Sequence, residues 1–214
     1  MKYSILTLLV TILIFTYSFG QETGKSVRIG TVFGWDQNVG GSKRIPTGSY
    51  TGYNPDFNKT NFSIGITMDY SLKNKIYAFT GLTYSNRDFT GTFYCEVCDF
   101  IVPPQPEPIS LSFLEIPVGL RFYLLASRLK PFAEAGLINQ FALQQELTTI
   151  EDSSPANAYV LSGSVGLGLE YGISRNIAML ARAAYTRGIS NLIEGMDYSM
   201  QIFSINASLV GRLN

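Results

Sequence analysis

Four carboxylates and four arginines are the residues of this chain that could do acid–base or ionic chemistry. They are Arg28, Asp69, Glu115, Arg121, Glu134, Glu170, Arg182 and Arg212. Paired carboxylates catalyse proton transfer when their environments separate their pKa values. Here four arginines match four carboxylates in number, which favours ionised, structural ion pairs. The chain has no histidine, which excludes hydrolases and acyltransferases that use His as the general base to Ser. We therefore expect no catalytic site and no enzyme.

Cys95 and Cys98 form a second chemical motif, CEVC, in a stretch without strong periodicity. It could be a redox dithiol, half of a metal site, or a small disulfide. A zinc site needs two further ligands and no His is present, and a thioredoxin-like motif needs a βαβ setting that is absent. We expect a loop disulfide formed in an oxidising compartment, with no metal and no cofactor.

The segments that carry the eight charges alternate between apolar and polar residues with a period of two. Each run is about ten residues long or more, which is the length a tilted strand needs to cross a bilayer. Residues 76–85 alternate least clearly, because both faces hold apolar side chains. The eight expected strands are 27–35, 62–72, 76–85, 114–124, 132–144, 159–171, 177–188 and 203–210.

Connections between these segments alternate between short and long. Residues 73–75, 126–131 and 172–176 are short, whereas 36–60, 86–108 and 145–157 are long. Short periplasmic turns and long external loops are typical of outer-membrane barrels. The fold class we predict is all-β: a closed, antiparallel, eight-stranded, up-and-down transmembrane β-barrel in the bacterial outer membrane, with both termini periplasmic.

A soluble eight-stranded calyx would show the same alternation, with its apolar set turned inward. In this chain the polar faces are rich in Gly, Ser and Thr, which suit a narrow lumen, and the bulky aliphatic residues suit lipid. All eight charges fall on the polar faces. We predict a lumen closed by Arg–carboxylate pairs, because buried charges are tolerated only when they are paired. The alternative left open is that some of them lie near the rims and are solvated.

The N-terminus has the order of a secretory signal: Lys2, an apolar run from Ile5 to Phe15, then small residues before Gln21. We expect residues 1–20 to be cleaved and residues 21–214 to form one barrel domain. Fifteen basic and sixteen acidic residues then remain, a net charge of −1. This charge gives no basic face for nucleic acid. The expected partners are outer-membrane lipid and, at the external loops, proteins; we expect a monomer.

Three short motifs resemble the PorT-like outer-membrane β-barrel family of Gram-negative bacteria. They are LSFLEIPVGLRFY at 111–123, KPFAEAGL at 130–137 and AYTRGISNL at 184–192. The resemblance implies an eight-stranded barrel of the OmpA/OmpX type without one shared activity. The chain departs from the common barrel ending, which is aromatic, because it finishes Arg212-Leu213-Asn214.

Three functions follow from these expectations. The first is a non-enzymatic barrel with a closed, charge-paired lumen and exposed external loops, in a structural or interaction role. The second, which rests only on the family name, is a component of an outer-membrane secretion or transport assembly. The third is a small-solute pore, which the matched lumen charges disfavour.

Overall fold

Eight long strands form the body of the molecule. The computed structural model describes residues 26–40, 44–125, 127–145, 157–193 and 197–213. The expected signal segment, 1–20, lies outside this part of the chain. The long strands are β1 (Val27–Asn38), β4 (Asn61–Lys73), β5 (Ile76–Asn86), β8 (Leu111–Tyr123), β9 (Leu129–Gln145), β10 (Tyr159–Gly172), β11 (Ile177–Gly188) and β12 (Gln201–Leu213). The eight predicted strands are therefore confirmed, each within a few residues of its expected ends.

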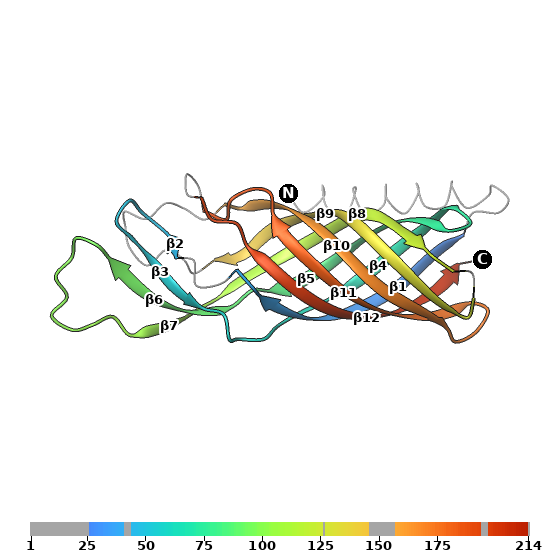
Figure 1. Ribbon diagram of the computed structural model, residues 1–214, viewed down its shortest axis with the longest axis horizontal. Helices are drawn as coiled ribbons and strands as arrows, with labels where there is room; N and C mark the ends of the chain where they lie inside the picture. Colours follow the sequence, from blue (N-terminus) through green and yellow to red (C-terminus); the bar gives the residue numbers. More distant parts are fainter. Residues whose placement is uncertain (1–25, 41–43, 126, 146–156, 194–196, 214) are drawn as a thin grey trace, which may run out of the picture.

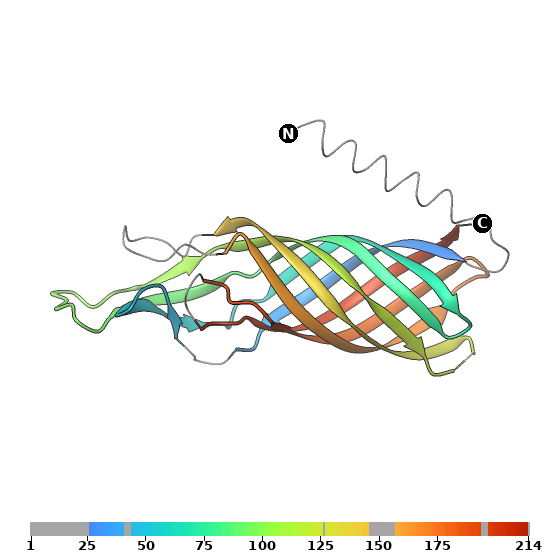
Figure 2. The same ribbon diagram turned by 90° about the horizontal axis from the view of Figure 1, so that it is seen from above.

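The eight strands close into a barrel in the order β1-β12-β11-β10-β9-β8-β5-β4, and β4 pairs with β1 to complete the ring. Every pairing is antiparallel, and the strands tilt steeply against the long axis (Figures 1 and 2). Val27 at the start of β1 lies opposite Leu213 at the end of β12, so both ends of the described barrel share the edge that carries the short turns. No helix among the described residues is long and apolar enough to span a membrane.

The barrel turns its apolar side chains outward. Along β4, Ile64 and Ile66 are more than half exposed, whereas Asp69 on the opposite face is buried. The period of two places successive side chains on opposite faces, so this alternation repeats around the ring. The weak alternation of β5 has a structural cause, because Tyr77 and the buried Phe79 are apolar residues on the inward face. An apolar exterior around a closed ring is the arrangement that lipid requires.

Aromatic side chains gather on the outer surface toward the long-loop end. Phe62 packs against Tyr84 with ring centroids 6.1 Å apart, and Phe141 against Tyr159 at 5.4 Å. Both are cross-strand pairs, of β4 with β5 and of β9 with β10. Such rings favour the level of the lipid headgroups, so they mark one membrane boundary of the barrel.

A second sheet extends beyond the barrel at the long-loop end (Figure 1, left). Its strands are β2 (Ile45–Pro46), β3 (Thr51–Asp56), β6 (Phe89–Cys95) and β7 (Pro106–Ile109), in the order β2-β3-β6-β7. We call this sheet the extension. The expectation that residues 36–60 and 86–108 are loops is wrong for these strands. They are short, with Pro46, Pro106 and Pro108 among their residues, so no single segment shows a long alternating pattern. β2 pairs with β3 and β6 with β7 within one connection each, and only the pairing of β3 with β6 joins the two connections.

An apolar cluster joins the extension to the barrel mouth. It contains Ile45, Tyr53, Phe89, Ile109, Leu111, Phe113, Val160, Leu192, Ile193, Tyr198 and Met200, all buried. We call it the apolar cap. Its members come from the connections between β1 and β4, between β5 and β8 and between β11 and β12, and from the ends of β8 and β10. Burial raises the pKa of the Tyr198 phenol above its ordinary value, so this side chain stays neutral.

Candidate functional site

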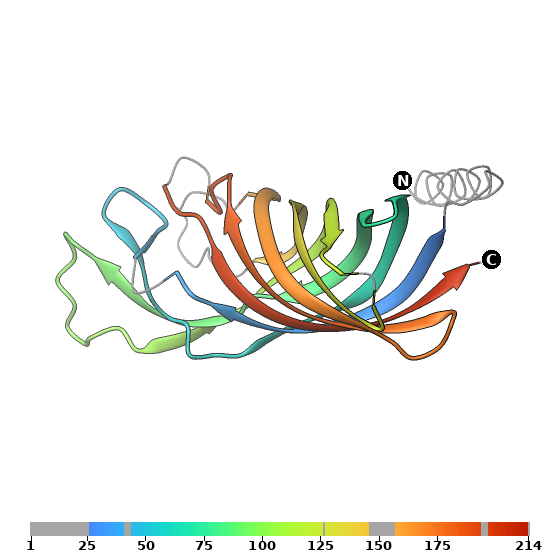
Figure 3. The same cartoon turned by 45° about the vertical axis from the view of Figure 1, so that its right-hand side comes forward.

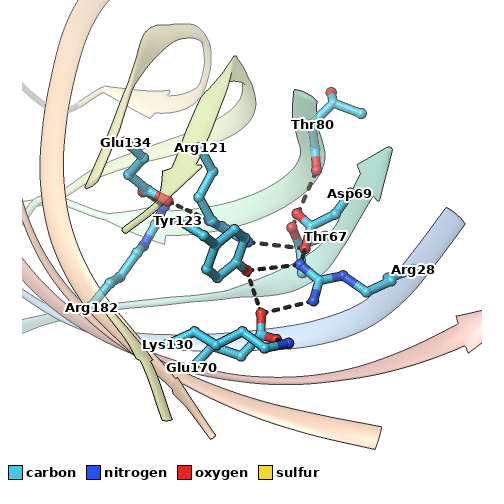
Figure 4. A network of polar contacts seen from close by, with 10 residues as sticks. All are labelled: Arg28, Thr67, Asp69, Thr80, Arg121, Tyr123, Lys130, Glu134, Glu170 and Arg182. Atoms are coloured by element: carbon cyan, nitrogen blue, oxygen red, sulfur yellow. Dashed lines mark hydrogen bonds and ion pairs between the residues drawn. The ribbon is translucent and has the colours of Figure 1, made fainter. Parts of the chain in front are cut away.

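The inward face of the barrel carries a network of ion pairs close to the short turns (Figure 4). Arg28 on β1 contacts Asp69 on β4 at 2.8 Å and Glu170 on β10 at 2.7 Å. Arg121 on β8 contacts the same Asp69 at 2.9 Å and Glu134 on β9 at 3.0 Å. Arg182 on β11 completes the network by pairing with Glu134. The pairs Arg28–Asp69 and Arg121–Glu134 join neighbouring strands at directly opposite positions. The other three contacts, from Arg28 to Glu170, from Arg121 to Asp69 and from Arg182 to Glu134, join strands that are not neighbours in the ring, so they reach across the lumen.

Two further side chains join this network. The Tyr123 hydroxyl accepts a hydrogen bond from Arg28 at 2.9 Å and donates one to Glu170. Lys130 lies 3.1 Å from the other oxygen of Glu170. We call these eight residues the turn-side ionic layer. The layer contains four cations and three carboxylates among the described residues, so its formal charge is +1.

A second ionic cluster lies near the other end of the lumen. Arg87, which directly follows β5, contacts Asp36 on β1 at 2.7 Å and Glu115 on β8 at 2.9 Å. Ser85 and Gln140 donate hydrogen bonds to the same Glu115 oxygen, at 2.7 and 2.8 Å. We call Asp36, Arg87 and Glu115 the extension-side ionic layer. With one cation and two carboxylates its formal charge is −1.

Arg87 is the charge that holds this second layer together. Its side chain is 4% exposed, and those of Asp36 and Glu115 are 2% and 8% exposed. Burial by itself would lower the pKa of the Arg87 guanidinium, but attraction to Glu115 and Asp36 outweighs burial and leaves the pKa raised. The guanidinium therefore stays charged, and both carboxylates depend on it for compensation.

Glycines make room for aromatic rings inside the narrow lumen. A Cβ atom on Gly119 would lie 2.5 Å from the ring of Phe79. A Cβ atom on Gly168 would likewise collide with the ring of Phe132. These rings lie beneath the arginines, with the guanidinium carbon of Arg121 4.8 Å from the Phe132 centroid and 5.4 Å from that of Phe79. The rings therefore fill space beside the ion pairs and add cation–π contacts.

The structure places the eight predicted charges in three groups. Six meet in the turn-side layer: Arg28, Asp69, Arg121, Glu134, Glu170 and Arg182. Glu115 lies in the other layer. Arg212 joins neither, because it is exposed near the open end of β12. For Arg212 the geometry agrees with the alternative of a solvated charge at the rim.

Sequence reasoning missed Asp36, Arg87, Tyr123 and Lys130 as members of the two layers. Asp36 and Arg87 were placed in external loops, and Lys130 in a turn. The missing signal was the alternation itself, which continues one step past each expected strand end: Thr83 and Ser85 share their face with Arg87. For charged residues just beyond a predicted strand end, the period of two therefore also decides whether the side chain points into the lumen.

Cys95 and Cys98 are joined by a disulfide at the end of β6, in the extension. Among the described residues, no group of three or more His, Cys, Asp or Glu side chains is arranged to hold a metal ion.

Comparison with known proteins gives a family and a fold. Residues 19–194 match the family described as "Outer membrane protein beta-barrel domain". OprG from Pseudomonas aeruginosa is a similar solved structure, with a TM-score of 0.56 at 12% identity over 91% of this chain and 98% of that one. Neisserial surface protein A (NspA) is another, with a TM-score of 0.54 at 15% identity over 89% of this chain and 99% of that one. No curated protein matches significantly.

The family match confirms the broader part of the resemblance found in the sequence, namely an outer-membrane β-barrel. The narrower PorT-like assignment is not supported, and the secretion-assembly function that depended on it loses its basis. At these identities the two solved structures show the fold alone. The all-β barrel, its apolar exterior and the family match agree: this chain is a bacterial outer-membrane protein and belongs to the outer membrane protein β-barrel domain family.

Proposed function

We propose that this protein is a closed, non-conducting and non-enzymatic barrel that anchors a folded extension at the cell surface. The observation that carries the proposal is the presence of two ionic layers, one near each end of the lumen. The apolar cap adds a third obstruction above them. A barrel of eight strands is narrow enough for side chains to fill its interior.

The ion pairs support closure because of the strands that they connect. Arg28 and Glu170 belong to β1 and β10, which are separated by two strands in the ring, so their contact spans the lumen. Arg87 reaches Asp36 across β4 in the same way. A solute would have to separate these buried charges from their partners, and a buried charge without its partner is strongly unfavourable in a low-dielectric interior.

The same contacts argue against catalysis by the lumen carboxylates. Asp69 and Glu134 each contact two arginines, and Glu170 contacts one arginine and Lys130. Both oxygens of Glu134 and both of Glu170 are occupied by these contacts. Both arginines of Asp69 contact the same oxygen, and its other oxygen is buried away from solvent. We infer a structural role for them, as supports of a rigid barrel.

The proposed orientation puts the short turns in the periplasm and the extension outside. It is supported by the alternation of short and long connections and by the shared end of β1 and β12. In this orientation the extension is, within the part of the chain that the structure describes, the largest element outside the membrane. We therefore infer that the role of the barrel is to hold this sheet at the cell surface.

Single-channel recording in planar bilayers tests closure. The folded protein, identified by its heat-modifiable migration on a denaturing gel, should give no stable conductance steps. Replacing Arg121 and Glu134 by Ala opens only the turn-side layer, and replacing Asp36, Arg87 and Glu115 by Ala opens only the other. We expect neither variant to conduct steadily, and the combined variant to conduct more than both. Stable steps from the unaltered protein would refute the proposal in favour of a small-solute pore.

A further inference from the structure

The end of the extension exposes apolar side chains far from the barrel. We call residues 96–104, between β6 and β7, the distal tip; they form the loop at the end of the molecule opposite the short turns (Figures 1 and 3). Ile101 is 99% exposed, Val97 71%, Val102 69% and Phe100 44%. Exposed apolar residues are expected on the lipid face of this protein, but the tip lies outside that face. Apolar side chains gathered in water mark an interaction surface.

The distal tip is held in shape by the sheet beneath it. The Cys95–Cys98 disulfide closes its first turn. Phe100 packs edge-on against Phe93 with centroids 6.2 Å apart, and Phe93 packs against Tyr53 at 5.9 Å. These contacts anchor one aromatic residue of the tip and leave the aliphatic residues facing solvent. The two restraints reduce the ordering entropy that is lost when the tip is buried.

The size and shape of the distal tip restrict what can cover it. Its four exposed side chains offer roughly half of the ~800 Å² that each partner contributes to a standard protein–protein interface. The tip is a narrow, projecting loop and not a broad or hollowed face. A lipid bilayer needs no complementary surface and gains stability from each apolar side chain that enters it. These properties favour a bilayer over a protein partner or a second copy of the chain.

The charges around the distal tip indicate which lipid headgroups it can approach. Among the described residues, the cation Arg44 contacts Glu96 at 3.2 Å and lies over the Tyr94 ring. Asp99 and Glu107 add negative charge beside the apolar residues. Negative charge disfavours approach to an anionic surface, because binding to anionic lipid depends on basic residues.

We propose that the distal tip is a membrane-contact site that inserts Val97, Ile101 and Val102 into a zwitterionic phospholipid bilayer facing the cell. The inference extends the proposed function, since it rests on the extension being displayed outside. It assigns to the extension a ligand class, namely the surface of another cell or vesicle.

Tryptophan quenching tests insertion directly. Trp35 is the only tryptophan, so Trp35→Phe with Ile101→Trp places one reporter at the tip. The protein is folded into donor vesicles of phosphatidylcholine and mixed with protein-free acceptor vesicles of brominated phosphatidylcholine. Fluorescence should shift to the blue and be quenched by the acceptors. Acceptors of brominated phosphatidylglycerol should quench less.

A vesicle-tethering assay compares a variant of the tip with a matched control variant. Ile101→Ser with Val102→Ser should weaken association with protein-free phosphatidylcholine vesicles by at least about tenfold, because apolar area is lost from the inserted surface. Val39→Ser is the control: Val39 is also exposed, at 43%, but lies outside the tip, and its variant should tether normally.

Three results would overturn the inference. They are an unquenched reporter, equal tethering by the serine and control variants, and tethering that occurs only between vesicles that both contain the protein. The last would indicate a second copy as the partner. Failure here leaves the conductance test untouched, so loss of the contact site and loss of the closed-barrel function are separate outcomes.

Discussion

Removing Arg87 should destabilise the barrel more than removing any exposed charge. Arg87 is the cation of the extension-side layer, and Arg87→Met leaves Asp36 and Glu115 buried without a positive partner. Breaking a buried pair by removal of one partner costs about 3–5 kcal/mol, because the remaining charge is uncompensated. We expect the free energy of unfolding to fall by that amount. The hydrogen bonds from Ser85 and Gln140 to Glu115 keep the loss from being larger.

Adding Asp36→Asn and Glu115→Gln to Arg87→Met should recover most of the lost stability. The triple variant removes the whole ionic set, and replacing a buried ion pair by neutral groups of similar volume is often neutral. Arg44→Met is the control, since its ion pair with Glu96 is more than half exposed and should contribute about 0–1 kcal/mol.

Reversible urea unfolding in phospholipid vesicles, followed by Trp35 fluorescence, measures these differences. Trp35 lies on β1 and is 53% exposed on the lipid face, so its emission reports loss of the membrane-embedded state. The reasoning fails if Arg87→Met costs no more than Arg44→Met. It also fails if the triple variant is no more stable than the single one, because the buried carboxylates would then not be the source of the loss.

Three further predictions concern the lipid face, the lumen packing and the extension. Leu167→Arg, on the lipid face of β10 at 68% exposure, should lower the unfolding free energy by about 2–4 kcal/mol in the same urea assay; an unchanged value would contradict the assigned facing. Gly168→Ala should cost about 1–3 kcal/mol through its collision with Phe132. Phe132→Ala removes the colliding ring but by itself costs about 3–5 kcal/mol, because Phe132 is buried. Relative to Phe132→Ala alone, Gly168→Ala should still be destabilising, because a backbone carbonyl also lies 2.5 Å from the new Cβ; no further loss would show that the ring alone is the obstacle. Iodoacetamide should modify Cys95 and Cys98 only after reduction, as read by mass spectrometry, and labelling without reductant would contradict the disulfide.

The barrel could be predicted from the sequence because lipid imposes a strict pattern on each strand. Ile64 and Ile66 must face hydrocarbon while Asp69 faces inward, and this alternation is visible without knowledge of the partner strands. The six charges that meet in the turn-side layer could be assigned to one face for the same reason. Which carboxylate pairs with which arginine depends on strand register and ring order, which the pattern of a single strand does not contain.

The extension could not be predicted, because its stability comes from contacts between distant loops. β3 pairs with β6 across more than thirty residues, and Tyr53 and Phe89 become buried only when both loops meet the end of the barrel. Short strands that contain prolines have weak local signals. The role of Arg87 was missed for a related reason: the ladder of β5 ends at Asn86, but its inward face continues for one more residue.

The ion pairs of the lumen contribute more to the choice of strand register than to the net stability of the barrel. A lumen filled with apolar side chains could be equally stable, since buried ion pairs contribute little net free energy. Yet strands that are apolar on both faces would tolerate a slip of one residue, because either face could lie against lipid. In β8, such a slip would turn Glu115 and Arg121 out of the lumen toward lipid, where an arginine costs up to about 2–4 kcal/mol at the bilayer midplane and less toward the interfaces. It would also leave Asp69 and Glu134 short of a cation inside. Each ion pair therefore penalises wrong registers on both strands that it connects, and the two layers apply this penalty near both ends of the barrel.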